Sequence, residues 1–377
     1  MKVIFVLRSI ANYGGVERVV VEKMNYLAEH GHHVTLVTYE QGNNPCVYHL
    51  NDNVRHVDLD CRYYTIYRYS LLIRLIKKWQ MMFRFRKRFH QFVKHLQPDV
   101  IIGVTNAADF MSQIMAAPYG KKIVESHGAF PAIMKGNTWR TKIKNYKILR
   151  AITKCDLLIS LTEADAACWK SHVKKVQNVP NPVSFYIEEP NTLQKHDGRI
   201  LYVGRLSTEK RIDRLIEAFS IIAPCFPSWY IDIYGTGNKK ADMILLIDKY
   251  GLNDRIHLME PTQHIVDEYQ SSQFLVLCSD NEGLPLVLLE AMASGLPCIS
   301  TRCPFGPPEI IEDGVTGLLC DMNSKDLATK MEWMIIHEAE RKQMGFKGHE
   351  SALKYKKDVV MKKWEEAYEG CLKPKIC

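Results

Sequence analysis

Short apolar stretches of strand length alternate with amphipathic helical stretches along most of this 377-residue chain. Parallel strands need a helical crossover between them, so the alternation predicts an α/β fold with doubly wound parallel sheets. In the first half, the helix with the clearest periodicity covers residues 15–30. The strands predicted in this half are 2–7, 33–38, 99–104, 122–125 and 157–161.

The strand–helix pattern stops near residue 178 and restarts at residue 199. The break is rich in proline, asparagine and charge and has no periodicity, as expected of a linker. A helix at 211–223 and strands at 199–203, 229–234, 256–258, 274–278 and 297–300 follow it. A chain of this length exceeds what one core supports. We therefore expect two Rossmann-like domains, 1–182 and 199–355, joined by a linker at 183–198 and with a ligand cleft between them.

The net charge of +8 is unevenly divided. Residues 1–182 carry 27 Lys/Arg against 13 Asp/Glu, whereas residues 183–377 carry 23 against 29. A basic first half suits an anionic partner, and phospholipid head groups, a lipid-linked phosphate and nucleic acid are the candidates.

The segment 62–95 holds ten Lys/Arg, no acid and many aromatic residues. One interpretation is an amphipathic helix packed on its own domain with a solvated basic face. The other, which we favour, is peripheral contact with an anionic membrane through this segment. We expect no nucleic-acid partner, because no recognition motif accompanies the charge.

The sequence also indicates a compartment. It has no apolar stretch long enough to predict a spanning helix, and Arg8 interrupts an N-terminal apolar run too short for a secretory signal. Eleven cysteines, without any Cys-x-x-Cys pair, suggest free thiols. We expect a cytoplasmic protein that lies peripherally on the inner face of the plasma membrane.

The most informative segment runs from Ser279 to Gly295. A strand ends there, a Gly/Pro loop follows, and a helix begins near Pro285, a residue suited to a first helical turn. Free N–H groups and the helix dipole make such a start an anion site. Glu290 points back towards the loop, where a carboxylate can accept both hydroxyls of a ribose. Glu282 precedes the helix, so it lies nearer to the group attached to a phosphate bound at this anion site.

A second strand-to-helix turn, Gly204-Arg-Leu-Ser-Thr-Glu-Lys210, brings two cations to one place. Arg205 offers a planar fork and Lys210 a point charge for the same anion. Two fixed cations can neutralise a departing pyrophosphate without a metal, so we expect no metal cofactor.

Two weaker patterns carry no function in our interpretation. Asp58-Leu-Asp60 has the Asp-x-Asp form of a metal site but no third ligand at fitting spacing, so we interpret it as a solvated strand end. Gly235-Thr-Gly237 is an incomplete dinucleotide fingerprint, which disfavours a dehydrogenase.

Three motifs occur in the order typical of one family: Gly14-Gly15-Val-Glu17, Gly204-Arg-x4-Lys210 and Glu282-x7-Glu290. With them, residues 1 to about 340 resemble the retaining GT-B glycosyltransferases of family 4 (glycosyl transferases group 1). The segment 303–311 is similar to members that build surface polysaccharides. The resemblance implies the GT-B fold of two Rossmann-like domains, with a last helix within 356–377 crossing back to the first domain.

The resemblance also implies roles for individual residues. Arg205 and Lys210 would bind the donor diphosphate, Glu282 the sugar hydroxyls and Glu290 the ribose. His127 would lie near the sugar, which makes it a catalytic candidate together with Glu282, Arg205 and Lys210. The backbone positions implied in donor binding are Gly15, Gly204, Gly283, Leu284, Pro285 and Leu286.

The function expected from these features is retaining transfer of a hexose from a nucleotide-sugar to a glycan or lipid-linked saccharide. UDP is the leading nucleotide and GDP the next. Surface polysaccharide or glycolipid synthesis is the implied setting. Two alternatives remain open at this point: a nucleotide-sugar epimerase on the same fold, and a non-catalytic, membrane-associated GT-B scaffold.

Overall fold

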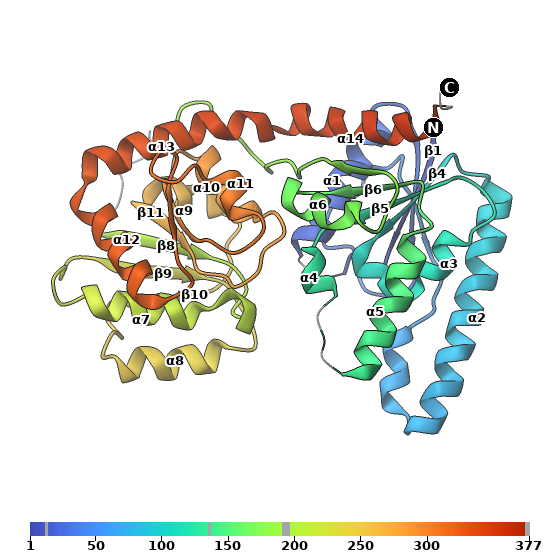
Figure 1. Cartoon of the computed structure of the whole chain (residues 1–377), viewed down its shortest axis with the longest axis horizontal. Helices are drawn as coiled ribbons and strands as arrows, with labels where there is room; N and C mark the ends of the chain where they lie inside the picture. Colours follow the sequence, from blue (N-terminus) through green and yellow to red (C-terminus); the bar gives the residue numbers. More distant parts are fainter. Residues whose placement is uncertain (12–13, 135, 137, 191–196, 374–377) are drawn as a thin grey trace. The chain divides into compact units, whose positions relative to one another are not determined.

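The computed structural model describes the chain except residues 12–13, 135, 137, 191–196 and 374–377. It divides into two compact units (Figure 1). The first comprises Met1–Pro180 with Met361–Cys377, and the second comprises Asn181–Val360. Each unit is built around one parallel sheet.

The first unit has a seven-stranded sheet in the order β3-β2-β1-β4-β5-β6-β7, and its described strand pairs are all parallel. Its strands are β1 (Lys2–Leu7), β2 (His33–Thr38), β3 (Arg55–Asp58), β4 (Val100–Val104), β5 (Lys121–Ser126), β6 (Leu157–Ser160) and β7 (Val176–Asn178). Its helices are α1 (Gly15–Glu29), η1 (Tyr63–Arg68), α2 (Leu71–Leu96), η2 (Thr105–Phe110), α3 (Met111–Met115), α4 (Phe130–Ile133), α5 (Trp139–Ile152) and α6 (Glu163–Lys170).

The central strand β1 shows why this sheet forms. Val3 to Leu7 are all fully buried, because helices cover both faces of a doubly wound sheet. Ile4 and Val6 belong to the apolar cluster that also contains Phe85 and Phe89 of α2. Phe5 faces the other way and meets the ring of Tyr368 edge-on at 6.3 Å.

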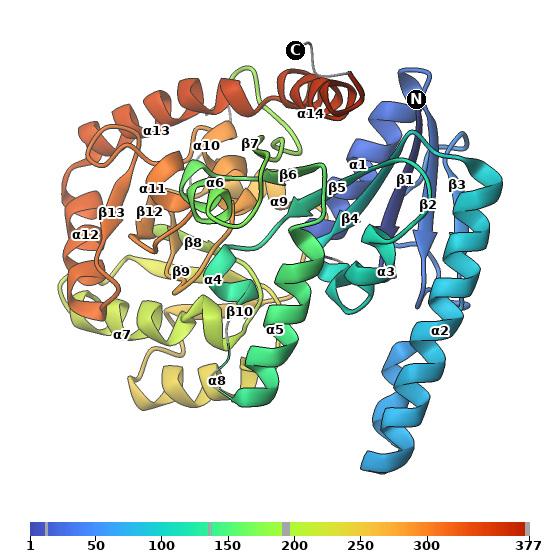
Figure 2. The ribbon, with the colours of Figure 1, turned by 45° about the vertical axis from the view of Figure 1, so that its right-hand side comes forward.

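The two halves of helix α2, which contains most of the basic segment, differ in burial. Its C-terminal half is packed on the sheet through Phe85, Phe89 and Val93, which are fully buried at helical spacing. Its N-terminal half extends beyond the sheet (Figure 2), and there Leu72 and Trp79 are 78% and 69% exposed. Membrane contact through 62–95 stays a prediction. In the part of the chain that the structure describes, no helix combines the length and apolarity needed to cross a bilayer.

The second unit repeats the design with six strands in the order β10-β9-β8-β11-β12-β13, again parallel in every described pair. The strands are β8 (Arg199–Val203), β9 (Tyr230–Tyr234), β10 (Ile256–Met259), β11 (Phe274–Leu277), β12 (Cys298–Thr301) and β13 (Leu318–Cys320). The helices are η3 (Thr208–Lys210), α7 (Ile212–Ile222), α8 (Lys240–Lys249), α9 (Ile265–Ser271), α10 (Leu286–Ala293), α11 (Pro307–Ile310), α12 (Ser324–Ile336), α13 (Glu338–Ala352) and η4 (Leu353–Tyr355). Figure 1 shows α7 and α8 on one side of this sheet and α10 and α13 on the other. The predicted α/β class with two Rossmann-like sheets is confirmed.

Two segments far apart in sequence complete the units. The last helix, α14 (Lys357–Leu372), belongs to the first unit from Met361 onward. There the indole N–H of Trp364 donates to the Pro180 carbonyl at 2.8 Å. Residues after Pro180 pack on the second unit, where the Ile187 N–H donates to the Ala293 carbonyl.

Candidate active site

In the second unit, hydrogen bonds and ion pairs connect the loop that follows β8 to the loop that follows β11. These strands are neighbours where the strand order reverses, which is where open α/β sheets bind ligands. The Asp280 N–H donates to the Glu209 carbonyl at 2.9 Å, and its carboxylate accepts from Arg211 and Arg214. Partial burial opposes ionisation of Asp280, but the two guanidinium groups outweigh it and lower its pKa.

This fastening brings together Lys210 and Glu282, which are 72 residues apart. The Lys210 ammonium donates to Glu282 Oε1 at 2.6 Å, and the Ser279 hydroxyl donates to the same oxygen at 2.6 Å. The two charged side chains are only 19% and 9% exposed. An ammonium has three N–H donors, so Lys210 can hold Glu282 and an anionic ligand at once.

The start of α10 presents backbone donors beside this pair. Pro285 was expected inside the first helical turn, but its ψ of 102° makes it the N-cap, and the helix begins at Leu286. Among the described residues no side chain caps this end, and the Leu288 N–H donates to the Pro285 carbonyl at 3.1 Å, so the Leu286 and Val287 N–H groups are the ones available to an anion. A Cβ on Gly306, whose φ is +84°, would lie 2.4 Å from the Gly283 carbonyl oxygen. Only glycine at position 306 therefore lets the loop after β12 approach the loop after β11 this closely.

Glu290 of α10 is buried, with 6% exposure. Its carboxylate accepts from the Tyr269 hydroxyl at 3.0 Å and from the Ser184 hydroxyl at 3.4 Å. These bonds hold the carboxylate in one orientation, as a ribose ligand would require. The ribose role itself stays a prediction.

The turn after β8 supplies the remaining candidates. Arg205 is exposed and follows Gly204 directly. A Cβ on Gly235 would lie 1.9 Å from the Gly204 carbonyl oxygen, so the Gly235-Thr-Gly237 turn packs directly against the Gly204 turn. Leu284 and Pro285 are buried, whereas Gly283 and Leu286 are partly exposed beside them.

In the first unit, His127 follows β5 and joins a buried charge network. Its Nε2 lies 2.8 Å from Glu125 Oε2, an atom that also accepts from the Lys23 ammonium. The Tyr368 hydroxyl of α14 donates to the other Glu125 oxygen at 2.5 Å. The Lys23 and Glu125 side chains are 1% and 0% exposed.

One ring nitrogen of His127 has no hydrogen-bond partner among the described residues. Burial and the Lys23 charge lower the pKa of His127 against the opposing effect of Glu125, so the ring is neutral at pH 7. With Nε2–H donating to Glu125, Nδ1 is an acceptor, and it is buried without a hydrogen-bond partner among the described residues. Such an atom suits the hydroxyl of a bound sugar.

Acidification is expected to destabilise the first unit in two steps. Because the folded pKa of His127 lies below that of the unfolded chain, stability falls as the pH drops below about 6.5. Burial opposes ionisation of Glu125, but Lys23 and His127 outweigh it and lower its pKa from 4.5 to about 2. The stability that the ionised Glu125 carboxylate contributes is therefore lost as the pH falls from 4.5 through about 2. Urea unfolding across these ranges checks both steps. His127→Gln should remove the first step and reduce the second, because His127 helps to lower the pKa of Glu125, and an unchanged profile in that variant would contradict the assignment.

The structure places the other sequence candidates as follows. Gly15 is exposed and opens α1, whose N-cap Gly14 accepts from the Tyr48 hydroxyl at 3.1 Å; Asn12 and Tyr13 lie outside the described residues. Asp58 ends β3 and accepts from the Gly42 N–H at 3.0 Å, which gives it a role in a turn.

Sequence reasoning missed four residues that hold the candidates in place: Ser279, Tyr269, Glu125 and Tyr368. Glu125 gave one usable signal, since a carboxylate inside a predicted buried strand needs a partner. The others carry hydroxyls that no motif distinguishes.

Two family models together match most of the chain. Residues 13–185 match the family described as Glycosyltransferase Family 4. Residues 186–351 match the family described as Glycosyl transferases group 1. The boundary between them falls close to the boundary between the two units.

Several curated proteins are similar over nearly their whole length. An uncharacterized glycosyltransferase of Haemophilus influenzae is 28% identical over 97% of this chain and 99% of its own. The amylovoran biosynthesis glycosyltransferase AmsD of Erwinia amylovora is 26% identical over 97% and 99%. A third relative, from Campylobacter jejuni, is 26% identical over 91% of both chains. It is an α-1,4-N-acetyl-D-galactosaminyltransferase named for a substrate that ends in PP-undecaprenol.

Solved structures share the fold at low identity. Sucrose-phosphate synthase from Thermosynechococcus elongatus has a TM-score of 0.81 at 17% identity and covers 98% of both chains. A variant of S. aureus TarM, crystallised with fondaparinux, α-GlcNAc-glycerol and UDP, has a TM-score of 0.78 at 15% identity. It covers 97% of this chain and 99% of its own.

Proposed function

The chain belongs to the GT-B glycosyltransferases of family 4 and group 1, and on that premise we propose that it is a retaining enzyme that uses a UDP-sugar. The proposed acceptor is a glycan or lipid-linked saccharide in surface polysaccharide or glycolipid synthesis. The observation that carries the donor assignment is the Lys210–Glu282 pair beside the uncapped start of α10. The setting is supported by the names of the Erwinia and Campylobacter relatives, and UDP by its presence with TarM.

The donor diphosphate is bound by Lys210, Arg205 and the first N–H groups of α10. As the bond between the sugar and the diphosphate breaks, its electron pair passes to a phosphate oxygen, where these fixed charges stabilise it. Glu290 accepts from the ribose hydroxyls, while Glu282 orients the sugar hydroxyls and steadies Lys210.

Retention follows from attack on the face that the diphosphate leaves. The acceptor oxygen bonds to the sugar carbon, and its proton passes to the departing phosphate oxygen. No side chain forms a covalent intermediate in this scheme. His127 accepts from a sugar hydroxyl through Nδ1, and Glu125 holds the ring in place. Two cations and a helix start neutralise the diphosphate, so the proposal requires no metal cofactor.

We also propose that the enzyme is cytoplasmic and contacts the inner face of the membrane peripherally through 62–95. The supporting feature is the exposed N-terminal half of α2, where Trp79 and Phe83 stack at 5.9 Å and are both exposed. Aromatic and basic side chains on one helix favour an anionic bilayer surface.

Thermal unfolding with UDP, GDP, ADP and NAD, each in EDTA and with magnesium, tests the donor site. UDP in EDTA is expected to stabilise the protein, by about 2.7 kcal/mol at one hundred times its dissociation constant. Stabilisation by GDP alone would replace the nucleotide in the proposal. Stabilisation only with magnesium would contradict the metal-free site, and none at all would favour the scaffold alternative.

A further inference from the structure

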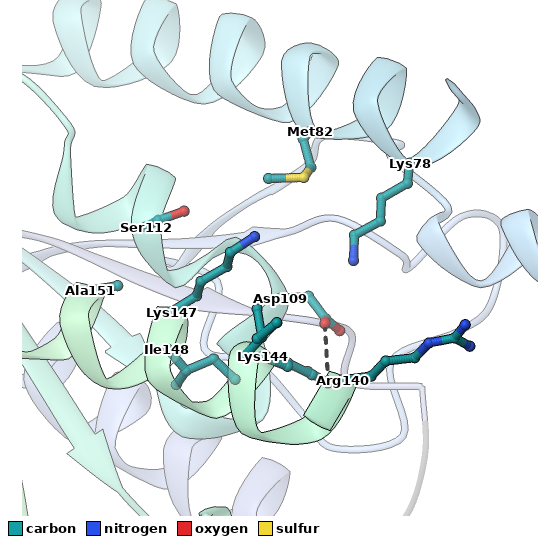
Figure 3. Close-up of a pocket in the computed structure, with 10 residues that line it drawn as sticks. Lys78, Met82, Asp109, Ser112, Arg140, Lys144, Lys147, Ile148 and Ala151 are labelled. Carbon is teal, nitrogen blue, oxygen red and sulfur yellow. Dashed lines mark ion pairs between the residues drawn. The ribbon is translucent and has the colours of Figure 1, made fainter. Parts of the chain in front are cut away.

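An open cavity of about 280 Å³ lies between α2 and α5 of the first unit (Figure 3). Its volume is near the lower end of small-molecule sites, roughly 300 Å³. The polar side chains that line it are Lys78, Asp109, Ser112, Arg140, Lys144 and Lys147.

The charge of this α2–α5 cavity selects an anion. Its lining holds four cations and one carboxylate, Asp109, which pairs with Lys144 at 3.5 Å. Figure 3 shows Lys78 extending from α2 towards α5 and Lys147 extending from α5 towards α2. Lysines that converge from two helices, with the Ser112 hydroxyl nearby, suit a group with more than one negative charge, such as a diphosphate.

Exposed apolar side chains beside the cavity favour a ligand that carries a lipid. Along α2, exposed apolar side chains recur at the spacing of one helix face. A second stripe follows α5 and shares Ile143 with the cavity lining. The exposed members are Leu72, Leu75, Ile76, Trp79 and Phe83 on α2, and Trp139, Ile143 and Tyr146 on α5. Exposed apolar side chains beside cations are typical of a membrane-contacting surface.

The cavity lies at the same edge of the first sheet as His127. Asp109 belongs to η2, which follows the carboxyl end of β4. At the start of η2, the Thr105 hydroxyl oxygen accepts from the backbone N–H of His127 at 3.3 Å. A single short helix therefore connects the cavity to the catalytic candidate, at the sheet edge where α/β folds bind ligands.

From this we propose that the α2–α5 cavity binds the diphosphate of a lipid-linked saccharide acceptor. The two apolar stripes enter the bilayer interface around it. This inference rests on the proposed function and narrows its acceptor to the lipid-linked class. A net positive lining of three charges matches a diphosphate better than the single charge of a phospholipid phosphate.

Binding to phosphatidylcholine vesicles that contain undecaprenyl diphosphate tests the proposal. Each basic residue near the surface contributes about 1 kcal/mol, or about fivefold in binding. The double variant Lys144→Gln/Lys147→Gln is therefore expected to bind these vesicles roughly 25-fold more weakly than the wild type. The matched control, Lys170→Gln/Lys174→Gln, removes two exposed lysines of the first unit that lie outside the cavity, outside 62–95 and outside α5, and should bind within about twofold of the wild type. Urea unfolding confirms that both variants are folded.

Wild-type binding by the cavity double variant would overturn the proposal. So would equal binding of the wild type to phosphatidylglycerol vesicles of matched charge, because the surface would then recognise phospholipid. Nucleotide binding separates the two levels of inference. If UDP stabilises the wild-type protein but the protein does not bind vesicles that contain undecaprenyl diphosphate, only the cavity assignment is refuted. If none of the nucleotides stabilises the protein, the proposed function is refuted.

Discussion

Lys210→Ala is expected to lower kcat of sugar transfer by about 100- to 1000-fold while the protein stays folded. The Lys210 ammonium is held by Glu282, in the loop that leads into the uncapped start of α10, so it is positioned before the diphosphate develops its charge. Removing one such preorganised donor raises mainly the free energy of the transition state, so it lowers kcat. Release of UDP in a coupled assay, with acceptor present, measures the loss.

Lys240→Ala is the matched control for this prediction. Lys240 is in the same unit and also forms an ion pair, with Glu260 at 2.5 Å, but it opens α8 on the surface. Its loss should leave kcat within about twofold of the wild type, as expected for an exposed pair. A Lys210→Ala enzyme with the wild-type rate would show that the donor site is elsewhere.

Glu125→Ala is expected to destabilise the first unit by about 3–5 kcal/mol. The substitution leaves the fully buried Lys23 ammonium without its counter-ion, and Tyr368 and His127 without their acceptor. Lys23 also lies 3.5 Å from the centre of the Trp364 ring, where water cannot replace the lost carboxylate. Urea unfolding followed by tryptophan fluorescence reports the change through buried Trp169 and Trp364.

Two further variants test the cause of that loss. Glu29→Ala removes an exposed carboxylate at the end of α1 and should change the stability by less than about 0.5 kcal/mol. Lys23→Met/Glu125→Leu removes both buried charges and should recover part of the stability, because an apolar pair of similar volume needs no counter-ion, while Tyr368 and His127 still lack their acceptor. If Glu125→Ala alone is as stable as the wild type, the buried network does not hold His127.

The strands that could be predicted were the buried ones. The strands β1, β2 and β8 are each buried except at one end residue and are mostly apolar, and their bounds agree with the prediction. The polar strands β3 and β7, and the three-residue β13, were missed. In β3, Arg55–Asp58, every residue is at least partly exposed, so burial imposes no apolar pattern on it.

The sequence by itself determined the two-sheet α/β plan and the loops that carry the donor-site candidates. Both depend on local physics: apolar runs that must be buried, and glycine and proline where strands turn into helices. Tertiary structure alone decided that Tyr368 holds Glu125 across 243 residues, and that Lys78 and Lys147 line one cavity. A buried charge takes its partner from whichever element packs against it, and no local pattern records which element that will be.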